Sequence, residues 1–313
     1  MKIEKEVEDF IKTINRKPLK EYFPKETAEE KKIEIDWNKD DIYVEALYQG
    51  YLDACRTFEW SEKVKEDHPN EKRKGYIEGK FKNDIACKIR EYLNNPKSQL
   101  FAVFHGKLCE NLKECFRKEE TNITHGQAQK IVNMAFKYLY CLYYEYGKLK
   151  EDQFADCHMP LDSFSLEWFK RRFKNDDFSN EKEALKLTEK LFKDKNGNLL
   201  LKAGAIDSWS SMESVGDEKE SNIYQGEKYP YEFYSDKINA YCKKSHNIKS
   251  PLELDFFVWS KMQKIMAAEA FIKTFKESTG DEAEKLKSKK YDVNELEKLL
   301  EEKMDEIKLL IGE

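Results

Sequence analysis

The 313-residue sequence lacks any long apolar run. No segment approaches the roughly 18 consecutive apolar residues that a membrane-spanning helix needs. The first six residues, Met1 to Glu6, also lack the apolar core of a secretory signal. We therefore expect a cytoplasmic protein with no membrane partner.

Cysteine is present, but not in any metal-binding or disulfide pattern. The seven cysteines are scattered and odd in number, and no two of them form a CxxC pair, which favours reduced thiols over a disulfide framework. Four closely spaced cysteines, as in an iron–sulfur site, are also absent. Cys157 and His158 are the only adjacent soft ligands, too few for a site by themselves. We expect no metal and no cofactor.

Positive charge is not in excess. The chain has 56 Lys and Arg residues against 61 Asp and Glu, a net charge of −5, which argues against a nonspecific nucleic-acid coat protein. Net charge does not report how charge is distributed, so one cationic face and a DNA partner remain compatible with this composition. Aromatic residues at 13% indicate a folded globular chain.

Strand-type alternation is scarce, and helical periodicity dominates, so the sequence predicts a mainly α fold. We expect a two-lobed helical core over 1–278, a polar and glycine-punctuated insertion at about 193–230, and an amphipathic helix over 279–313. That last helix is expected to dock on its own domain, with a homodimeric coiled coil as the alternative. Helices are predicted over 42–58, 77–93, 99–117, 127–146, 163–173, 181–192, 231–243 and 252–277.

A lysine and an aspartate stand at two predicted helix starts. Lys130 follows a short turn at Gly126, and Asp162 follows Pro160 in a typical N-cap position. A nucleophilic lysine must be neutral, so its pKa would have to fall from about 10.4 to near 7.5, which corresponds to about 4 kcal/mol. Alternatively, the lysine is a solvated helix residue and the aspartate an ordinary cap.

The turn before Lys130 also suggests an anion site. A helix N-terminus leaves backbone N–H groups without partners, and these groups suit a phosphate. We therefore predict that His125, Gly126 and Gln127 contact a DNA backbone.

A third segment contains an aspartate and a tryptophan on one helix face. Asp255 and Trp259 are four residues apart after Pro251. An acidic acceptor beside a flat indole suits a pocket for an extruded base, because it combines hydrogen bonding with stacking. The alternative is that Trp259 packs in the core with Phe256 and Phe257.

Together these segments resemble a known family. Gln129-Lys130 with the apolar helix after it, Met159-Pro160-Leu161-Asp162, and the segment from Pro251 to Trp259 are similar to archaeal-type 8-oxoguanine DNA glycosylases, a branch of the helix-hairpin-helix glycosylase superfamily. The resemblance covers about 120–173 and 247–262. It implies a helix-hairpin-helix glycosylase fold, with the hairpin and catalytic segment at about 118–175.

The resemblance also implies roles for individual residues. Lys130 would be the nucleophile and Asp162 the essential carboxylate, with Asp255, Trp259 and Gln129 at the base pocket. The chain departs from the family in having one glycine at the turn instead of two, and in its insertion. Such an insertion beside the pocket would alter base specificity, and Trp209 is its expected contributor.

We therefore expect a DNA glycosylase that flips out a modified base and cleaves its N-glycosidic bond, with AP lyase activity through a Schiff base as an option. The base would be 8-oxoguanine or a hypermodified base such as a phage cytosine derivative, which would place the protein in DNA repair or in antiviral defence. Two alternatives stay open: a non-enzymatic helical interaction protein, and a HEPN-like nuclease using Arg117 and His125.

Overall fold

The protein is mainly α-helical, as the sequence predicts. The computed structural model describes residues 3–14, 19–23, 33–118, 121–173, 208–214, 230–245 and 248–277, with four isolated positions between 298 and 305. No strand occurs in this described part. The α-helices are α1 (Ile3–Thr13), α2 (Asp41–Ala54), α3 (Glu62–Asp67), α4 (Asn70–Asp84), α5 (Ala86–Asn94), α6 (Phe101–Arg117), α7 (His125–Glu145), α8 (Ser163–Arg172), α9 (Tyr231–Lys244) and α10 (Pro251–Glu277), with 3-10 turns η1 (Leu19–Tyr22), η2 (Cys55–Thr57), η3 (Pro96–Ser98) and η4 (Trp209–Ser211).

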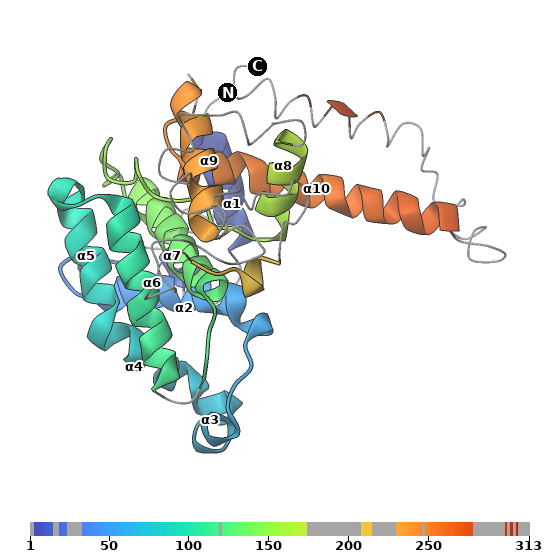
Figure 1. Cartoon of the computed structure of the whole chain (residues 1–313). Coiled ribbons are helices and arrows are strands. Elements are labelled where there is room, and N and C mark those ends of the chain that lie inside the picture. Colours follow the sequence, from blue (N-terminus) through green and yellow to red (C-terminus); the bar gives the residue numbers. More distant parts are fainter. Residues whose placement is uncertain are drawn as a thin grey trace, which may run out of the picture.

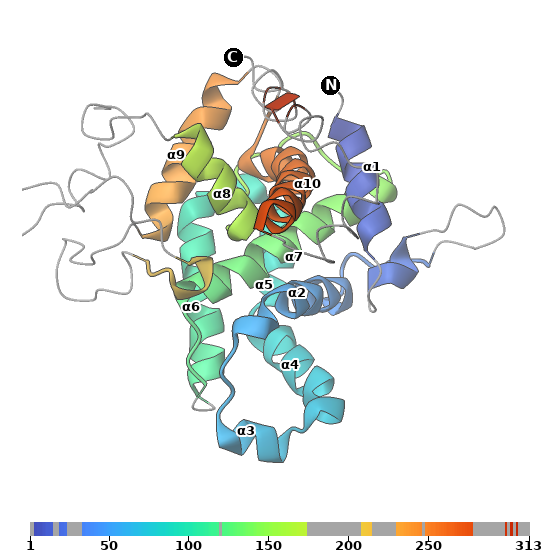
Figure 2. The ribbon, with the colours of Figure 1, turned by 90° about the vertical axis from the view of Figure 1, so that its right-hand side faces the viewer.

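Helix α7 runs through the centre of the molecule, surrounded by the other helices (Figures 1 and 2). Every residue from His125 to Tyr143 is buried. Thr124 caps its start: the hydroxyl accepts from the Gln127 N–H at 3.1 Å, and the Gln127 side chain accepts from the Thr124 N–H at 2.9 Å. The helix therefore carries polar side chains, Lys130, Asn133 and Lys137, into the interior.

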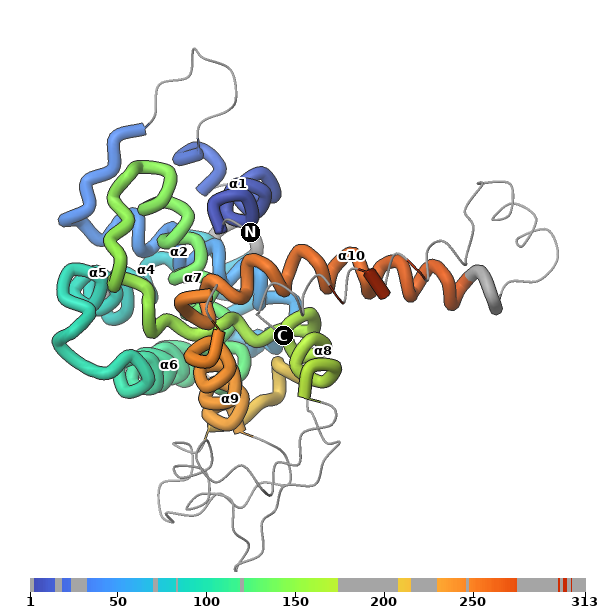
Figure 3. The backbone as a smooth tube through the Cα atoms, turned by 90° about the horizontal axis from the view of Figure 1, so that it is seen from above, coloured from blue at the N-terminus to red at the C-terminus, as the bar shows by residue number. Residues whose placement is uncertain are grey.

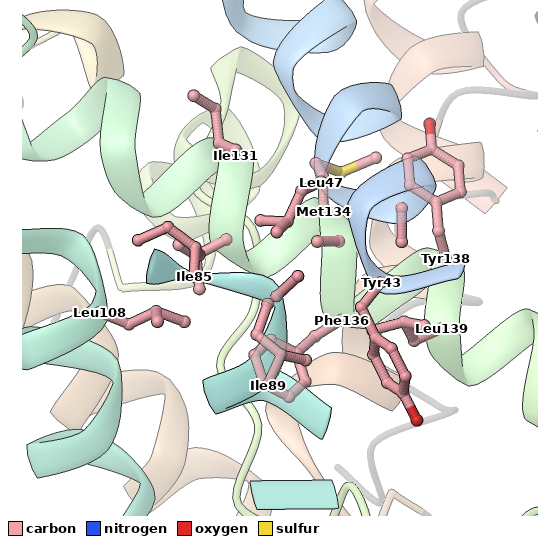
Figure 4. Packing of buried hydrophobic residues seen from close by; sticks show 14 of the residues in the cluster. Tyr43, Leu47, Ile85, Ile89, Leu108, Ile131, Met134, Phe136, Tyr138 and Leu139 are labelled. Atoms are coloured by element: carbon pink, nitrogen blue, oxygen red, sulfur yellow. The ribbon is translucent and has the colours of Figure 1, made fainter. Parts of the chain in front are cut away.

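Two clusters of buried apolar residues lie on different sides of this axis. The larger contains side chains of α1, α2 and α4–α7, and Figure 4 shows Ile85 and Ile89 packing near Ile131 and Phe136 of α7. The smaller contains side chains of α8, α9 and α10 together with Met212. Helix α10 belongs to both, because Leu252 and Phe256 belong to the first cluster while its neighbours Leu254 and Phe257 belong to the second. Beyond this packed part, α10 extends away from the body (Figure 3).

Several predicted elements differ in the structure. The single helix expected over 77–93 is two helices that break at Ile85. The residue before the break is Asp84, and aspartate has a low helix propensity and is favoured at helix ends. Helices α1 and α3 were not predicted. The helix expected over 181–192, most of the 193–230 insertion and nearly all of 279–313 lie outside the described residues, as does any dimer contact there.

Among the residues that the structure describes, no helix is both long enough and apolar enough to cross a membrane.

Candidate functional site

Asp162 is the N-cap of α8, as its sequence position predicts. One carboxylate oxygen, Oδ1, accepts from the backbone N–H groups of Phe164 at 2.9 Å and Ser165 at 3.0 Å. In return, the Asp162 N–H donates to the Ser165 hydroxyl at 2.7 Å, which completes a capping box. The carboxylate is therefore fixed by its own helix, and its second oxygen, Oδ2, remains available to another partner.

That partner is Lys130 of α7. The Lys130 Nζ donates to Asp162 Oδ2 at 2.6 Å, and both side chains are largely buried. Burial raises the pKa of the Asp162 carboxyl, but the Lys130 charge and hydrogen bond, together with the Ser165 N–H, outweigh burial and lower the pKa below its ordinary value. The structure thus brings together the two residues that the sequence analysis singled out as nucleophile and carboxylate.

The pair lines a cavity of about 490 Å³, a size in the range of small-molecule sites. The cavity lies where α1, α2, α7, α8, η4 and α10 meet, and Figure 2 shows these helices around α7. Four of the residues singled out in the sequence line it: Lys130, Asp162, Trp209 and Trp259. Its other lining residues include Phe10, Ile14, Gln49, Leu52, Asp53, Arg56, Met134, Tyr138, Phe164 and Gln263.

Asp255 does not line the cavity, contrary to the sequence-based expectation. Its carboxylate accepts from the Lys137 Nζ at 2.6 Å, and both side chains are almost fully buried, at 2% and 0% exposed. Burial raises the pKa of the Asp255 carboxyl, and the nearby Asp162 raises it further, although Lys137 opposes both. The Lys137 ammonium also lies over the rings of Phe10, at 3.9 Å, and Trp259, at 5.2 Å. Asp255 therefore contacts Lys137, whose ammonium lies over the ring of Trp259, a residue of the cavity wall.

Gln129 is likewise a structural residue in this conformation. Its side chain donates to the Leu161 carbonyl at 2.9 Å and accepts from the Leu161 N–H at 3.2 Å. It is fully buried and absent from the cavity lining. These two bonds fix the backbone just before Asp162, so Gln129 helps to position the carboxylate.

The start of α7 is covered and offers no phosphate surface. His125, Gly126 and Gln127 are all buried, and the Gly126 N–H already donates to the Met212 carbonyl at 2.9 Å. A Cβ on residue 126 would lie 1.7 Å from the Trp209 carbonyl oxygen. The glycine therefore serves the close approach of the Trp209 segment. As they stand, these buried residues present no exposed surface for the predicted DNA-backbone contacts.

The sequence analysis missed the contribution of α2 to the cavity. Asp53 accepts a hydrogen bond from the Tyr138 hydroxyl at 2.6 Å, and Gln49 and Arg56 line the same side. A signal was present, because Asp53 is an acidic residue next to the apolar stripe of the predicted helix 42–58. Phe10 and Ile14 come from the N-terminal segment, for which no element was predicted.

The structure also shows where the other residues singled out in the sequence lie. Arg117 ends α6 while His125 begins α7 and is 2% exposed, so the two do not share a helix face as the HEPN-like alternative requires. Cys157 and His158 are buried. His158 Nδ1 lies 2.8 Å from the Tyr231 hydroxyl. In the described ranges, no group of three or more His, Cys, Asp or Glu side chains is arranged to hold a metal ion.

Comparison of the chain with protein-family models, curated proteins and solved structures found no match.

Proposed function

We propose that the protein is a DNA glycosylase that takes a modified base into the cavity and cleaves its N-glycosidic bond. The observation that carries this proposal is the buried Lys130–Asp162 pair, with 2.6 Å between Nζ and Oδ2, in the wall of a 490 Å³ cavity that also contains two tryptophans. A buried amine next to a carboxylate is an arrangement suited to covalent chemistry at an electrophilic carbon. The finer fold assignment, a helix-hairpin-helix glycosylase with the hairpin and catalytic segment at about 118–175, belongs to the same proposal.

The chemistry follows from the two groups. Lys130 must first give up a proton, and Asp162 Oδ2 is the acceptor already in contact with it. The amine then forms a bond to C1′ of the sugar while the N-glycosidic bond breaks. The base departs with that electron pair and takes up the proton that Asp162 received from Lys130, so Asp162 is again a charged carboxylate. Positive charge develops on the sugar as the bond breaks, and the fixed Asp162 carboxylate would stabilise it.

The aromatic residues suit an extruded base. Trp209, Trp259, Phe164 and Phe10 all line the cavity, and stacking between aromatic side chains is how enzymes hold a flipped base. Trp259 is itself held edge-on by Phe10, with ring centroids 5.4 Å apart. Trp209, from the segment that interrupts the helical pattern, also lines the cavity, and this added aromatic surface supports the proposal of an unusual base such as 8-oxoguanine or a hypermodified cytosine.

Borohydride trapping tests this function. Wild-type protein incubated with duplex DNA that carries the modified base should be crosslinked by reduction of the Schiff base at Lys130, and Lys130→Gln should abolish the crosslink. Asp162→Asn should lower release of the free base, measured by mass spectrometry, by at least tenfold.

A matched control is available on the surface. Lys97 and Asp152 form an exposed pair with 2.8 Å between Nζ and Oδ2, so Lys97→Gln removes a lysine with the same kind of partner but no cavity. It should be trapped as well as the wild type. Absence of both crosslinking and base release from all DNAs in a panel of modified bases would refute the proposed function, whereas base release without crosslinking would show a monofunctional enzyme.

A further inference from the structure

The 3-10 turns η2 and η4 are fixed against the start of α7, and both contribute to the cavity lining. The Gln127 side chain donates to the Thr57 carbonyl at 2.6 Å and to the Thr57 hydroxyl at 3.0 Å, which holds η2 in place. The Thr124 hydroxyl donates to the Ser210 carbonyl at 2.6 Å, which holds η4. Both turns are therefore fixed within about two helical turns of Lys130.

Arg56, the middle residue of η2, is a cation at the mouth of the cavity. It lines the cavity and is exposed to solvent, whereas Lys130 in the same lining is 5% exposed. Lys130 is already paired with Asp162. Within the ranges that the structure describes, no residue forms a hydrogen bond or an ion pair with the Arg56 guanidinium. All of its N–H donors are therefore open to an anionic ligand.

Asp53 is an acidic residue of the same wall, but its carboxylate is directed to another partner. Its Oδ2 accepts from the Tyr138 hydroxyl at 2.6 Å, and Tyr138 is 5% exposed. Asp53 therefore lowers the positive potential around Arg56 and leaves the guanidinium donors open. An anion at Arg56 is then held by direct charge-assisted hydrogen bonds and not by a broad positive surface, in keeping with the net charge of −5.

A DNA phosphate is the anion that the proposed substrate would bring to this position. The proposed bond cleavage places C1′ of the sugar at the Lys130 amine, and the aromatic side chains of the cavity take the base. The phosphates of that nucleotide are attached to other carbons of the sugar, so they stay on the exposed side of the cavity, where Arg56 lies. A guanidinium suits a phosphate because its planar fork donates parallel hydrogen bonds to two oxygens.

We propose that Arg56 binds a phosphate next to the extruded nucleotide and so holds the sugar over Lys130. Arg56 thereby takes the role that the sequence analysis gave to the first turn of α7. Gln127 is then a positioning residue, because it fixes η2 through Thr57. A phosphate contact sets the register of the DNA and does not read the base. This inference rests on the proposed glycosylase function and names the backbone contact of the same site.

Binding to duplex DNA that contains a tetrahydrofuran residue tests the inference, because this abasic analogue keeps the sugar and its phosphates and has no base to release. Fluorescence anisotropy measures the affinity over a range of salt concentrations. Arg56→Gln should weaken binding about tenfold at low salt. It should also make the slope of log K against log salt less steep by about 0.9, the value for one lost phosphate contact.

Three comparisons separate a phosphate contact from a structural role. Arg56→Lys keeps the charge and removes the planar fork, so it should keep the wild-type slope and bind only a few-fold more weakly than the wild type. Lys97→Gln removes an exposed cation outside the cavity and should keep both slope and affinity. In base release from modified DNA, Arg56→Gln should raise KM about tenfold and leave kcat within about twofold, because the phosphate contact is the same before and during bond cleavage.

An affinity and a salt slope of Arg56→Gln equal to those of the wild type would overturn this inference and leave the glycosylase proposal standing. A loss confined to kcat, or an equal fall in slope for Lys97→Gln, would overturn it as well. Failure of the wild type to release or trap any base in the panel would refute the proposed function, and the inference with it.

Discussion

The buried Lys137–Asp255 pair gives the sharpest test of how the structure is held together. The Lys137 side chain is 0% exposed and Asp255 2% exposed, with 2.6 Å between Nζ and Oδ2. The ammonium otherwise faces aromatic rings, with Phe10 at 3.9 Å and Phe256 at 4.8 Å. The perturbation is Asp255→Asn, which keeps the shape of the side chain and removes its negative charge.

The expected loss is large because the lysine charge would remain buried. Removing one partner of a fully buried ion pair costs about 3–5 kcal/mol. Cation–π contacts recover only about 2 kcal/mol even when desolvated, and they exist already in the wild type, so they offset little of this loss. The same substitution in the exposed Lys97–Asp152 pair should cost about 0–1 kcal/mol.

Urea unfolding followed by tryptophan fluorescence measures both variants. Asp255→Asn should lower the free energy of unfolding by about 3–5 kcal/mol, and Asp152→Asn by less than about 1 kcal/mol. The double variant Lys137→Met with Asp255→Leu should recover most of the stability, because two apolar residues can replace a buried pair without a desolvation cost. If Asp255→Asn cost no more than Asp152→Asn, the reasoning from burial would be wrong.

Three further predictions concern other parts of the chain. Gly50→Ala should destabilise the fold by about 1–3 kcal/mol, because a Cβ there would lie 2.5 Å from the Ile131 carbonyl oxygen. Gly79→Ala, in open space on α4, should stabilise the fold by about 0.4–1 kcal/mol. Urea unfolding measures both variants. Burial and the neighbouring His125 lower the pKa of His158 to about 3. The unfolded chain therefore binds more protons between pH 6.5 and 3, so the free energy of unfolding should fall by about 1.4 kcal/mol per pH unit on acidification, and His158→Gln should remove that part of the slope. Trp209→Ala, which removes one candidate stacking surface, should raise KM for base release about 5- to 150-fold, the range given by about 1–3 kcal/mol of stacking.

Local patterns in the sequence were sufficient to predict the long helices and to single out Lys130 and Asp162. Helices α6, α7 and α10 lie close to their predicted ranges, because each has a continuous apolar pattern without a strong break. Lys130 and Asp162 were identified from helix-start signals, and the structure brings them together. Local pattern is thus informative where a residue's role is set by its own helix, as the N-cap role of Asp162 is.

Long-range contacts set the roles that the sequence did not reveal. In the sequence, Gly126 looks like a turn residue. In the structure, glycine is required there because the Trp209 carbonyl, more than 80 residues away along the chain, leaves no room for a Cβ. The four-residue spacing of Asp255 and Trp259 predicted that Asp255 lines the pocket, yet the Asp255 carboxylate accepts a hydrogen bond from Lys137 instead. Helical periodicity says which face a side chain is on, but not what lies opposite that face.

The polar residues of α7 explain how the cavity acquires its shape. Lys130 contacts Asp162 before α8, Asn133 donates to the Tyr231 hydroxyl of α9 at 3.0 Å, and Lys137 contacts Asp255 of α10. One helix of the larger cluster thus forms polar contacts with α9, with α10 and with the N-cap of α8 in the smaller cluster.

Because buried pairs add little net stability, we infer that these contacts fix how the two clusters meet, and with it the width of the cavity between them. The variant with Met at 137 and Leu at 255 separates the two effects. It should unfold at nearly the wild-type urea concentration, and yet it should release base more slowly, because Trp259 loses the ammonium that lies 5.2 Å from its ring. Unchanged release by this stable variant would show that Lys130 and Asp162 keep their positions without the polar contact to α10.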